Sequence, residues 1–466
     1  MTRAPIGVAF ERFGDNAGFC ANLEAVSVQR LGARRALPLR RPGRSAPWRL
    51  AGRLPPALAE RDYRFFLAAL FTSGFGGQMV QVAIGWQVYA LHESAFDLGL
   101  IGLVEFVPLL ALALPAGHLA DRFSRRNLMA VSLALEGLTT SLLIVVSLAG
   151  ARALWPFLAL AAAIGAAAAL GAPPQRALPA SLIRVELLAS AMALRSVAGQ
   201  TAVVAGPALG GLLFALSPVV PYATATAMVA GGLACTLAMS EPPARSGTMA
   251  PGFRSVLAGI HFIRAAPVIL GAITLDLFAV LFGGAIALAP LFARTILHTG
   301  PFGLGLLRSA PAVGALAAAA ILTRKPLRYA AGRTLLVVVA AFGVCMIVFG
   351  LSRSLPLSLG ALAVSGFVDM FSVNIRSTTV ALATPDALRG RVLAVENVFI
   401  SASNEFGAFE SGAAAALLGA VPAVVVGGAI TIALAAIWRW VFPALAAVER
   451  MEELTPVAVD TGPDAT

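Results

Sequence analysis

Charged residues are scarce in this sequence. Asp, Glu, Lys and Arg make up 12% of the 466 residues, about half of the ~25% that is usual in soluble domains. Hydrophobic residues make up 59%, and the mean hydropathy is +0.85. Because a soluble protein of this length needs a charged surface, these values exclude a soluble enzyme and a disordered scaffold. They predict an integral membrane protein.

Residue types that build common reaction centres are scarce as well. The one lysine, Lys325, follows no glycine-rich loop, so a P-loop nucleotide site is excluded. The four histidines lie far apart, and no pair has the spacing of a metal site. The three cysteines are scattered and indicate no disulfide framework. We therefore expect no metal, no cofactor and no enzyme activity.

Long apolar runs fill most of the chain. A helix needs about 20 apolar residues to cross the hydrocarbon core of a bilayer, and twelve stretches meet this length. The runs are continuous and rich in Ala, Leu and Gly, which favours helices over the alternating strands of a barrel. The expected spans are residues 65–91, 98–120, 128–148, 154–172, 197–216, 219–239, 268–292, 302–322, 334–351, 357–382, 393–418 and 421–442.

Arginine is distributed unevenly between the loops. One alternate set of loops carries only Arg152, Arg294 and Arg353. By the positive-inside rule the richer set faces the cytoplasm, which puts both termini in the cytoplasm of a multi-pass inner (plasma) membrane protein. The net charge of +11 is then mostly a topology signal, and no soluble face is left for nucleic acid. The richer loops contain Arg122, Arg125, Arg126, Arg176, Arg184, Arg195, Arg245, Arg254, Arg264, Arg324, Lys325, Arg328, Arg333, Arg389 and Arg391.

The two halves of the chain resemble each other at an offset near 200 residues. Arg176 and the residues after it match Arg376 and its followers, and Gly76-Gly77 matches Gly283-Gly284. This order of matches predicts a duplicated unit: an all-α membrane fold of twelve transmembrane helices, in two six-helix bundles related by pseudo-two-fold symmetry. The expected parts are a disordered basic cytoplasmic tail (1–62), an N-terminal bundle (63–239), a cytoplasmic linker (240–264), a C-terminal bundle (265–442) and a cytoplasmic tail (443–466). A start codon assigned too early is an alternative for residues 1–60.

The strongest local motif follows the second span, where residues 117–126 read GHLADRFSRR. It resembles the G-x-L-A-D-R-x-G-R-R loop of the major facilitator superfamily, with Ser124 in place of the second glycine. In that family the loop locks the outward-facing state, and its Asp can engage the positive N-terminus of a neighbouring helix. The alternative is an ordinary positively charged turn. The resemblance implies a conformational lock made of Gly117, Asp121, Arg122, Arg125 and Arg126.

Two further segments resemble exporters of the same superfamily. Gly206-Pro207-x-x-Gly210-Gly211 in the fifth span is similar to the core of their antiporter motif, although Ala202 replaces an earlier glycine. Proline and glycine there would kink the helix and permit close packing; the alternative is a plain small-residue packing face. Residues 389–412 resemble the enterobactin-exporter-like branch, which includes drug exporters, and the overall resemblance spans residues 63–442.

Ionisable and polar residues within the spans are functional candidates, because each intramembrane charge costs ~2.5–3.5 kcal/mol. Asp369, Ser372 and Arg376 share one helix face, as do Asn397 and Asn404, and such faces should line a cavity. A buried carboxyl can bind and release a proton near neutral pH. The alternative is a structural ion pair, which is favoured for Arg376 and Glu396. Arg308 is a further charge, in the eighth span. The proton-coupling or substrate candidates are Glu105, Asp276, Asp369, Arg376, Asn404, Glu405, Glu410, Gln78, Gln81 and Trp86.

These features together predict a secondary active transporter that functions as a monomer. The resemblance implies proton-driven efflux of a small amphipathic molecule, a siderophore or a drug-like compound, by alternating access. The alternatives are a passive channel or a non-transporting membrane sensor. A membrane-embedded lipid enzyme is a weaker alternative, because it would need clustered His, Cys or Ser at membrane depth, and the sequence has no such cluster.

Overall fold

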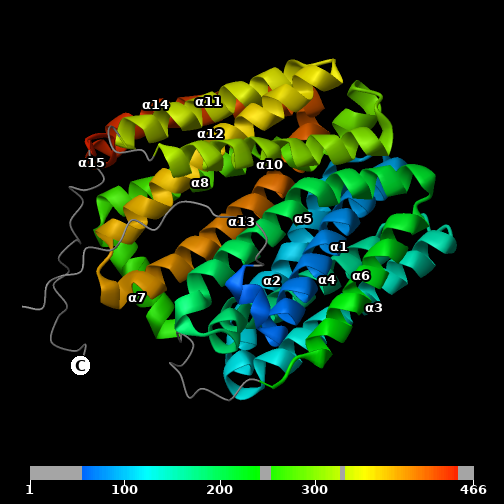
Figure 1. Ribbon diagram of the computed structural model, residues 1–466. Helices are drawn as coiled ribbons and strands as arrows, with labels where there is room; N and C mark the ends of the chain where they lie inside the picture. The colour runs from blue at the N-terminus through cyan, green and yellow to red at the C-terminus, as the bar shows by residue number, and fades with distance from the viewer. Residues whose placement is uncertain (1–54, 242–252, 326–330, 450–466) are drawn as a thin grey trace, which may run out of the picture. The chain divides into compact units, whose positions relative to one another are not determined.

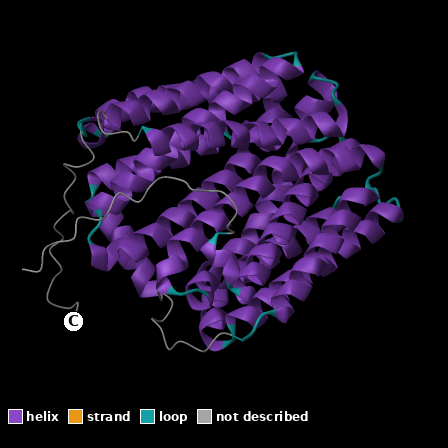
Figure 2. Ribbon diagram, viewed as in Figure 1, coloured by secondary structure: helices purple, strands orange, loops and turns teal. Residues whose placement is uncertain are grey.

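The computed structural model describes residues 55–241, 253–325 and 331–449, all within one compact unit, Leu54–Thr466. This described part of the chain contains helices, turns and short loops and no β-strand (Figure 2). The all-helical fold is the one that the continuous apolar runs predict, because a helix satisfies its backbone hydrogen bonds within itself.

Six long helices make up the first half of the described chain. A short 3₁₀ helix, η1, precedes the first of them, and a second, η2, precedes the fifth. The elements are η1 (Pro56–Ala59), α1 (Arg61–His92), α2 (Ala95–Arg122), α3 (Arg125–Leu148), α4 (Trp155–Leu182), η2 (Val185–Leu187), α5 (Leu188–Leu216) and α6 (Val219–Ala238).

The second half repeats this plan with two additions. A linker helix, α7, precedes the first long helix, and that long helix breaks after Gly283 into short 3₁₀, α and π segments. The elements are α7 (Phe253–Ala265), α8 (Pro267–Gly283), η3 (Ala285–Leu288), α9 (Ala289–Leu291), η4 (Phe292–Ile296), α10 (Gly300–Arg324), α11 (Ala331–Leu351), α12 (Leu355–Ala383), α13 (Asp386–Leu418), α14 (Ala420–Val441) and α15 (Pro443–Ala446).

Eleven helices in the described ranges are long and apolar enough to cross a membrane, with Pro267–Ile296 counted as one. Helix α13 is longer than any of them, at 33 residues, but its acidic side chains lower its hydropathy. With α13 the described chain has twelve long helices, at the positions of the predicted spans.

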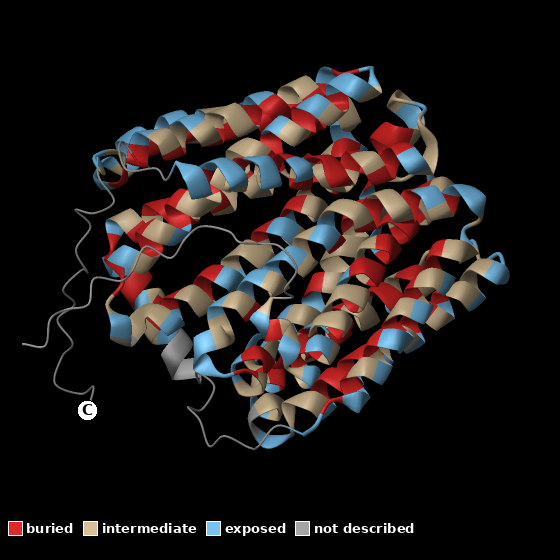
Figure 3. Cartoon of the chain, viewed as in Figure 1, coloured by how far each residue is buried: buried red, intermediate tan, exposed pale blue. Residues whose placement is uncertain are grey.

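Apolar residues on the outer helices face away from the protein. On α3, Val131, Leu138 and Val145 are 55%, 57% and 59% exposed, and on α11, Val337 and Val344 are 66% and 50% exposed. Figure 3 shows exposed residues recurring along the outer helices. Residues seven apart lie on one helix face, so each helix presents an apolar stripe that acyl chains can cover. The matching stripes on α3 and α11 also agree with a duplicated unit.

The helices pack in the same pattern in both halves (Figure 1). In the first half α1 packs against α5 and α6, and α2 packs against α4; in the second half α8 packs against α13 and α14, and α10 packs against α12. The two halves meet along two helix pairs, α2 with α13 and α5 with α10. This repeated packing confirms the predicted fold class of two six-helix bundles.

Glycines permit the close approach of the halves. A Cβ atom at Gly305 of α10 would lie 2.5 Å from the carbonyl oxygen of Pro207 in α5. A Cβ atom at Gly412 of α13 would lie 2.8 Å from the Cα atom of Gly99 in α2. Small residues let helix backbones pack closely in this way where apolar burial alone gives no driving force between helices.

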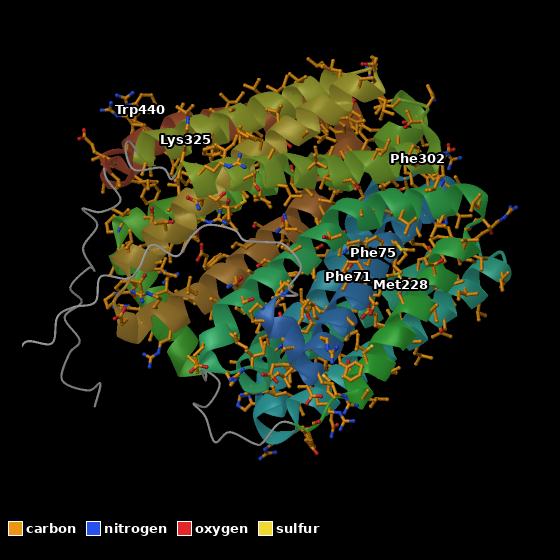
Figure 4. All side chains as sticks on the ribbon, in the orientation of Figure 1. Phe71, Phe75, Met228, Phe302, Lys325 and Trp440 are labelled. Atoms are coloured by element: carbon orange, nitrogen blue, oxygen red, sulfur yellow. The ribbon has the colours of Figure 1, made fainter. Side chains whose placement is uncertain are left out.

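The halves share an apolar core at one end only among the described clusters. We call the end with the α2–α3 turn the basic end; in the C-terminal half Lys325 and Trp440 lie at this end and Phe302 at the other (Figure 4). At the opposite end one cluster joins Val82 and Tyr89 of the first half to Phe292 and others of the second. The described clusters at the basic end each belong to one half.

The predicted tails and linker are partly outside the described residues. Residues 1–54, 242–252 and 450–466 are not described. Within the predicted N-terminal tail, η1 is helical and Ala57 in it is buried. Within the predicted linker, helix α7 occupies the last part and packs against α13.

Candidate transport site between the two halves

Four polar side chains from four helices meet between the halves. Glu105 of α2 is hydrogen-bonded to Gln81 of α1, and it interacts electrostatically with Glu405 and Arg308. Arg308 of α10 interacts with both carboxylates. Because α13 and α10 belong to the other half, these residues bridge the bundles. We call this group the interface cluster: Gln81, Glu105, Arg308 and Glu405.

Helix packing between α2 and α13 makes room for the Glu405 carboxylate. A Cβ atom at Gly102 of α2 would lie 3.0 Å from Oε2 of Glu405, so glycine leaves the space that the carboxylate needs. Aromatic rings lie beside this point, with Phe106 of α2 edge-on to Phe406 of α13 at 5.5 Å between centroids. The packing of α2 against α13 thus places Gly102 next to Glu405.

The charges of the interface cluster do not balance. Two carboxylates and one guanidinium leave one negative charge in excess when all are ionised. A charge at membrane depth is costly, ~2.5–3.5 kcal/mol on insertion scales. The cluster can therefore lower its energy by binding one proton or one cationic group of a ligand, which is the chemistry of a coupled transport site.

A second charged group lies inside the C-terminal half. Arg376 of α12 forms ion pairs with Asp276 of α8 and with Glu396 of α13, the latter at 3.3 Å between Nε and Oε1. All three residues are buried. Asp369, two turns earlier on α12, interacts electrostatically with Asp276 and Arg376. We call this group the Arg376 network: Asp276, Asp369, Arg376 and Glu396.

The remaining polar candidates make contacts of a different kind. Gln78 packs against Gly206, whose Cβ atom would lie 2.7 Å from that of Gln78. Trp86 packs against the apolar clusters of α1. Asn404 is exposed and donates a hydrogen bond to the Ile400 carbonyl oxygen at 2.9 Å. That the polar faces of these helices line a cavity stays a prediction.

Glu410 lies on another side of α13 from Glu405 and Asn404. It lines an open groove of about 650 Å³ between α8 and α13, together with Leu277, Phe406 and other apolar residues. By helical periodicity Phe406 and Asn404 point in nearly opposite directions. Glu410 thus belongs to the groove and not to the interface cluster.

The predicted lock loop contacts α6 through Arg126 of α3, within the N-terminal half. Arg126 donates hydrogen bonds to the carbonyl oxygens of Thr236, at 3.2 Å, and Leu237, where a cation favours the negative end of a helix. Ser124 caps α3 by accepting a hydrogen bond from the Asn127 N–H at 3.2 Å, which gives its replacement of glycine a local structural reason. The side chain of Asp121 lies outside the described ones. Gly117, Arg122 and Arg125 stand at or beside the α2–α3 turn.

The glycine-proline motif of α5 faces two neighbours. Gly206 and Gly210 pack on α1, and a Cβ atom at Gly210 would lie 2.8 Å from the Cα atom of Met79. Gly211 packs on α10 next to Gly305, and Pro207 supplies the carbonyl oxygen that approaches Gly305. The motif therefore lies at the contact between α5 and α10, where the two halves meet. A role in close helix packing between the halves requires this position.

Two charged residues were not among the sequence candidates. Arg308 was noted only as a charge in its span, yet it is the cation of the interface cluster. Glu136 of α3 was missed; its Oε1 would lie 3.9 Å from a Cβ atom at Gly77 of α1. The criterion that selected the other acids, an ionisable residue inside an apolar run, also finds Glu136.

The fold and the charged groups between its halves define a transporter of the major facilitator superfamily. Among solved structures, a bacterial homologue of the human lysosomal transporter Spinster, inward-facing and unoccupied, superposes with a TM-score of 0.65 at 14% identity, over 85% of this chain and 97% of that one. A D-xylose–proton symporter superposes with a TM-score of 0.62 at 13% identity, over 82% and 97%. At these identities the likeness shows the fold alone.

The family follows from the sequence match. The model of the transmembrane secretion effectors matches residues 53–460, so the chain belongs to this family of transporters. It is 28% identical over 362 residues to the multidrug efflux pump Tap of Mycolicibacterium fortuitum, covering 74% of this chain and 87% of Tap. It is 26% identical over 337 residues to the enterobactin exporter EntS of Shigella flexneri, covering 71% and 79%.

Proposed function

We propose that this protein is a proton-driven exporter that moves a small amphipathic molecule, a siderophore or a drug-like compound, out of the cytoplasm by alternating access. The observation that carries the proposal is the interface cluster. Its acids and its arginine come from both halves, so a rocking of one half against the other must change their distances and their access to water. A proton or a ligand cation bound there couples its own binding to that movement.

Several features support the direction and the setting. Tap is named a multidrug efflux pump and EntS an enterobactin exporter, and both resemble this chain over most of its length. The arginine-rich loops favour an orientation with the basic end in the cytoplasm of the plasma membrane. The shared apolar core at the opposite end fits a state that loads from the cytoplasm. One chain carries both halves, as a functional monomer requires.

The driving force is sufficient for this work. One proton entering down a potential of 100 mV supplies ~2.3 kcal/mol, and each unit of pH difference adds ~1.4 kcal/mol. Together these terms support an accumulation of more than tenfold, since tenfold corresponds to ~1.4 kcal/mol.

Proteoliposomes with an imposed pH gradient test the proposal. With an acidic lumen, the wild-type protein should accumulate ethidium, an amphipathic cation, and a separate assay with an iron-free catecholate siderophore tests the other substrate class. Glu405→Gln should lose the gradient dependence. Glu410→Gln is the matched control, because it makes the same change on the groove side of the same helix and should keep it.

The outcomes separate the alternatives. Uptake that ignores the gradient in both the wild type and Glu405→Gln would overturn proton coupling. Flux that only equalises concentrations would indicate a passive channel, and no flux of any probe would indicate a sensor.

A further inference from the structure

The Arg376 network lies within the C-terminal half, whereas the interface cluster joins both halves. Arg376 is 4% exposed, and Asp276 and Glu396 are 8% and 5% exposed. Ion pairs tie this one residue of α12 to both α8 and α13. The network thus joins three helices of the C-terminal half at their polar faces.

The charges in the network are strongly unbalanced. Three carboxylates surround one guanidinium, which leaves two negative charges in excess if all are ionised. Among the described residues, the ion pairs of Arg376 are those with Asp276 and Glu396, so Asp369 has no direct cationic partner.

The surroundings offer no second cation among the described residues that line the two small pockets here. Helices α8, α11 and α13 contribute apolar side chains, among them Val339, Phe342 and Phe399, and the one further polar group is the hydroxyl of Ser372. Buried charge without a partner costs far more than a neutral acid. A bound proton is the smallest change that reduces this excess, from two negative charges to one.

We propose that the C-terminal half carries a proton-binding site of its own, the Arg376 network, with Asp369 as its first proton acceptor. The site is distinct from the interface cluster, where the substrate would bind. That this site supplies a coupling proton in addition to the one at the interface cluster rests on the proposed function; that it binds a proton does not.

The structure offers a path from this site to the interface. Helix α13 carries Glu396 of the network and, nine residues later, Glu405 of the interface cluster, about 14 Å along the axis at ~1.5 Å per residue. Protonation of Asp276 or Glu396 removes an ion pair that fixes α8 or α13 to α12. Because α13 also packs on α2 of the other half, a change in its attachment reaches the contact between the halves.

Infrared difference spectroscopy during a pH titration measures proton binding directly in the purified full-length protein. The wild type should show a protonated carboxylic acid band within the apolar interior, and Asp369→Asn should lose part of it. Arg376→Gln should increase the band, because removal of the one guanidinium favours neutral acids. Glu410→Gln, outside both groups, is the matched control and should leave the Asp369 component unchanged.

Transport then tests the link to coupling. Asp369→Asn should lose gradient-driven accumulation of ethidium while it keeps exchange of internal for external ethidium, since exchange needs no net proton movement. Glu105→Gln, in the interface cluster, should instead weaken ethidium binding and so slow exchange too.

The results distinguish this proposal from the transport proposal. An acid band that is the same in the wild type, Asp369→Asn and Arg376→Gln would overturn the proton site, whatever the transport data show. If Asp369→Asn does not fold, the response of Arg376→Gln still decides. A band that responds as expected in a protein that moves no ethidium would support the site and count against the transport of that cation alone.

Discussion

Arg176 and Arg376 hold corresponding places in the two halves, but their surroundings differ. Arg376 is buried between two carboxylates, whereas Arg176 on α4 is exposed. If Gly76 is the counterpart of Gly283, then Ala69, which is fully buried, stands where the second half has Asp276. The halves therefore share their helix packing but not their charges.

This difference shows what duplication preserves. Packing of α1 with α5 and α6 recurs as packing of α8 with α13 and α14, because small and apolar residues at the contacts are enough to keep it. Buried ion pairs need matched partners from several helices, so one half can gain or lose them without a change of fold. Of the two corresponding arginines, the one in the C-terminal half forms the buried ion pairs.

The largest difference in stability between the two halves should come from substitution of their corresponding arginines. Arg376→Leu leaves the buried acids Asp276 and Glu396 without their cation and should destabilise the protein by ~3–5 kcal/mol, the usual cost of breaking a buried pair. Arg176→Leu should change stability by less than ~0.5 kcal/mol, as surface substitutions do. Unfolding of both variants in the same detergent measures the difference, and equal effects would show that the two positions are not as unlike as their burial indicates.

The joint between the halves gives the next largest effect. Gly305→Ala should destabilise by ~1–3 kcal/mol, as overpacking does, because its Cβ atom would meet the backbone of Pro207 at 2.5 Å. Gly360→Ala on α12 meets open space and should stabilise its helix by up to about 1 kcal/mol. Thermal unfolding and the ethidium transport rate check both variants. A neutral Gly305→Ala would mean that α5 and α10 can separate at little cost.

Two serines at helix N-termini, one in each half, should differ in their contribution to stability. Ser124 caps α3 with its side chain, whereas Ser354 precedes α12 without a side-chain cap. Ser124→Ala should cost ~1 kcal/mol and Ser124→Gly only a few tenths, in keeping with the glycine that the superfamily loop has there. Ser354→Ala should be nearly neutral in the same unfolding assay; a larger loss at Ser354 than at Ser124 would contradict the cap assignment.

The smallest expected effect on stability comes from an exposed ion pair between the halves, at the end opposite the basic end. Glu93, which precedes α2, pairs with Arg294 of η4 at 3.2 Å across the halves, and the side chains are 67% and 32% exposed. Such a pair contributes below ~1 kcal/mol. Glu93→Arg or Arg294→Glu alone should loosen this end and alter the transport rate, and the double reversal should restore it. A double variant no better than either single one would show that the pair does not hold the halves together.

Sequence reasoning reached most of the fold but only part of the site. The apolar runs located the long helices, including α13, whose acids lower its hydropathy below that of the other eleven. The same reasoning named Glu105, Glu405 and Glu410 as proton-coupling or substrate candidates, which stays a prediction. It did not link Glu105 and Glu405 to Arg308, and it did not separate them from Glu410, which lines the groove between α8 and α13. Helix α13 turns by ~100° per residue, so five positions along the helix move a side chain to a different neighbour.

The sequence by itself determined where the long apolar helices lie and which loops carry the positive charge, because hydropathy and charge are properties of consecutive residues. Only the tertiary structure decided which charges meet. Glu105, Arg308 and Glu405 lie on three helices far apart in the chain, and their meeting depends on the rotation and height at which those helices pack. Glycines such as Gly102 set that packing through close contacts, and no local pattern in the chain specifies the partner on the other side.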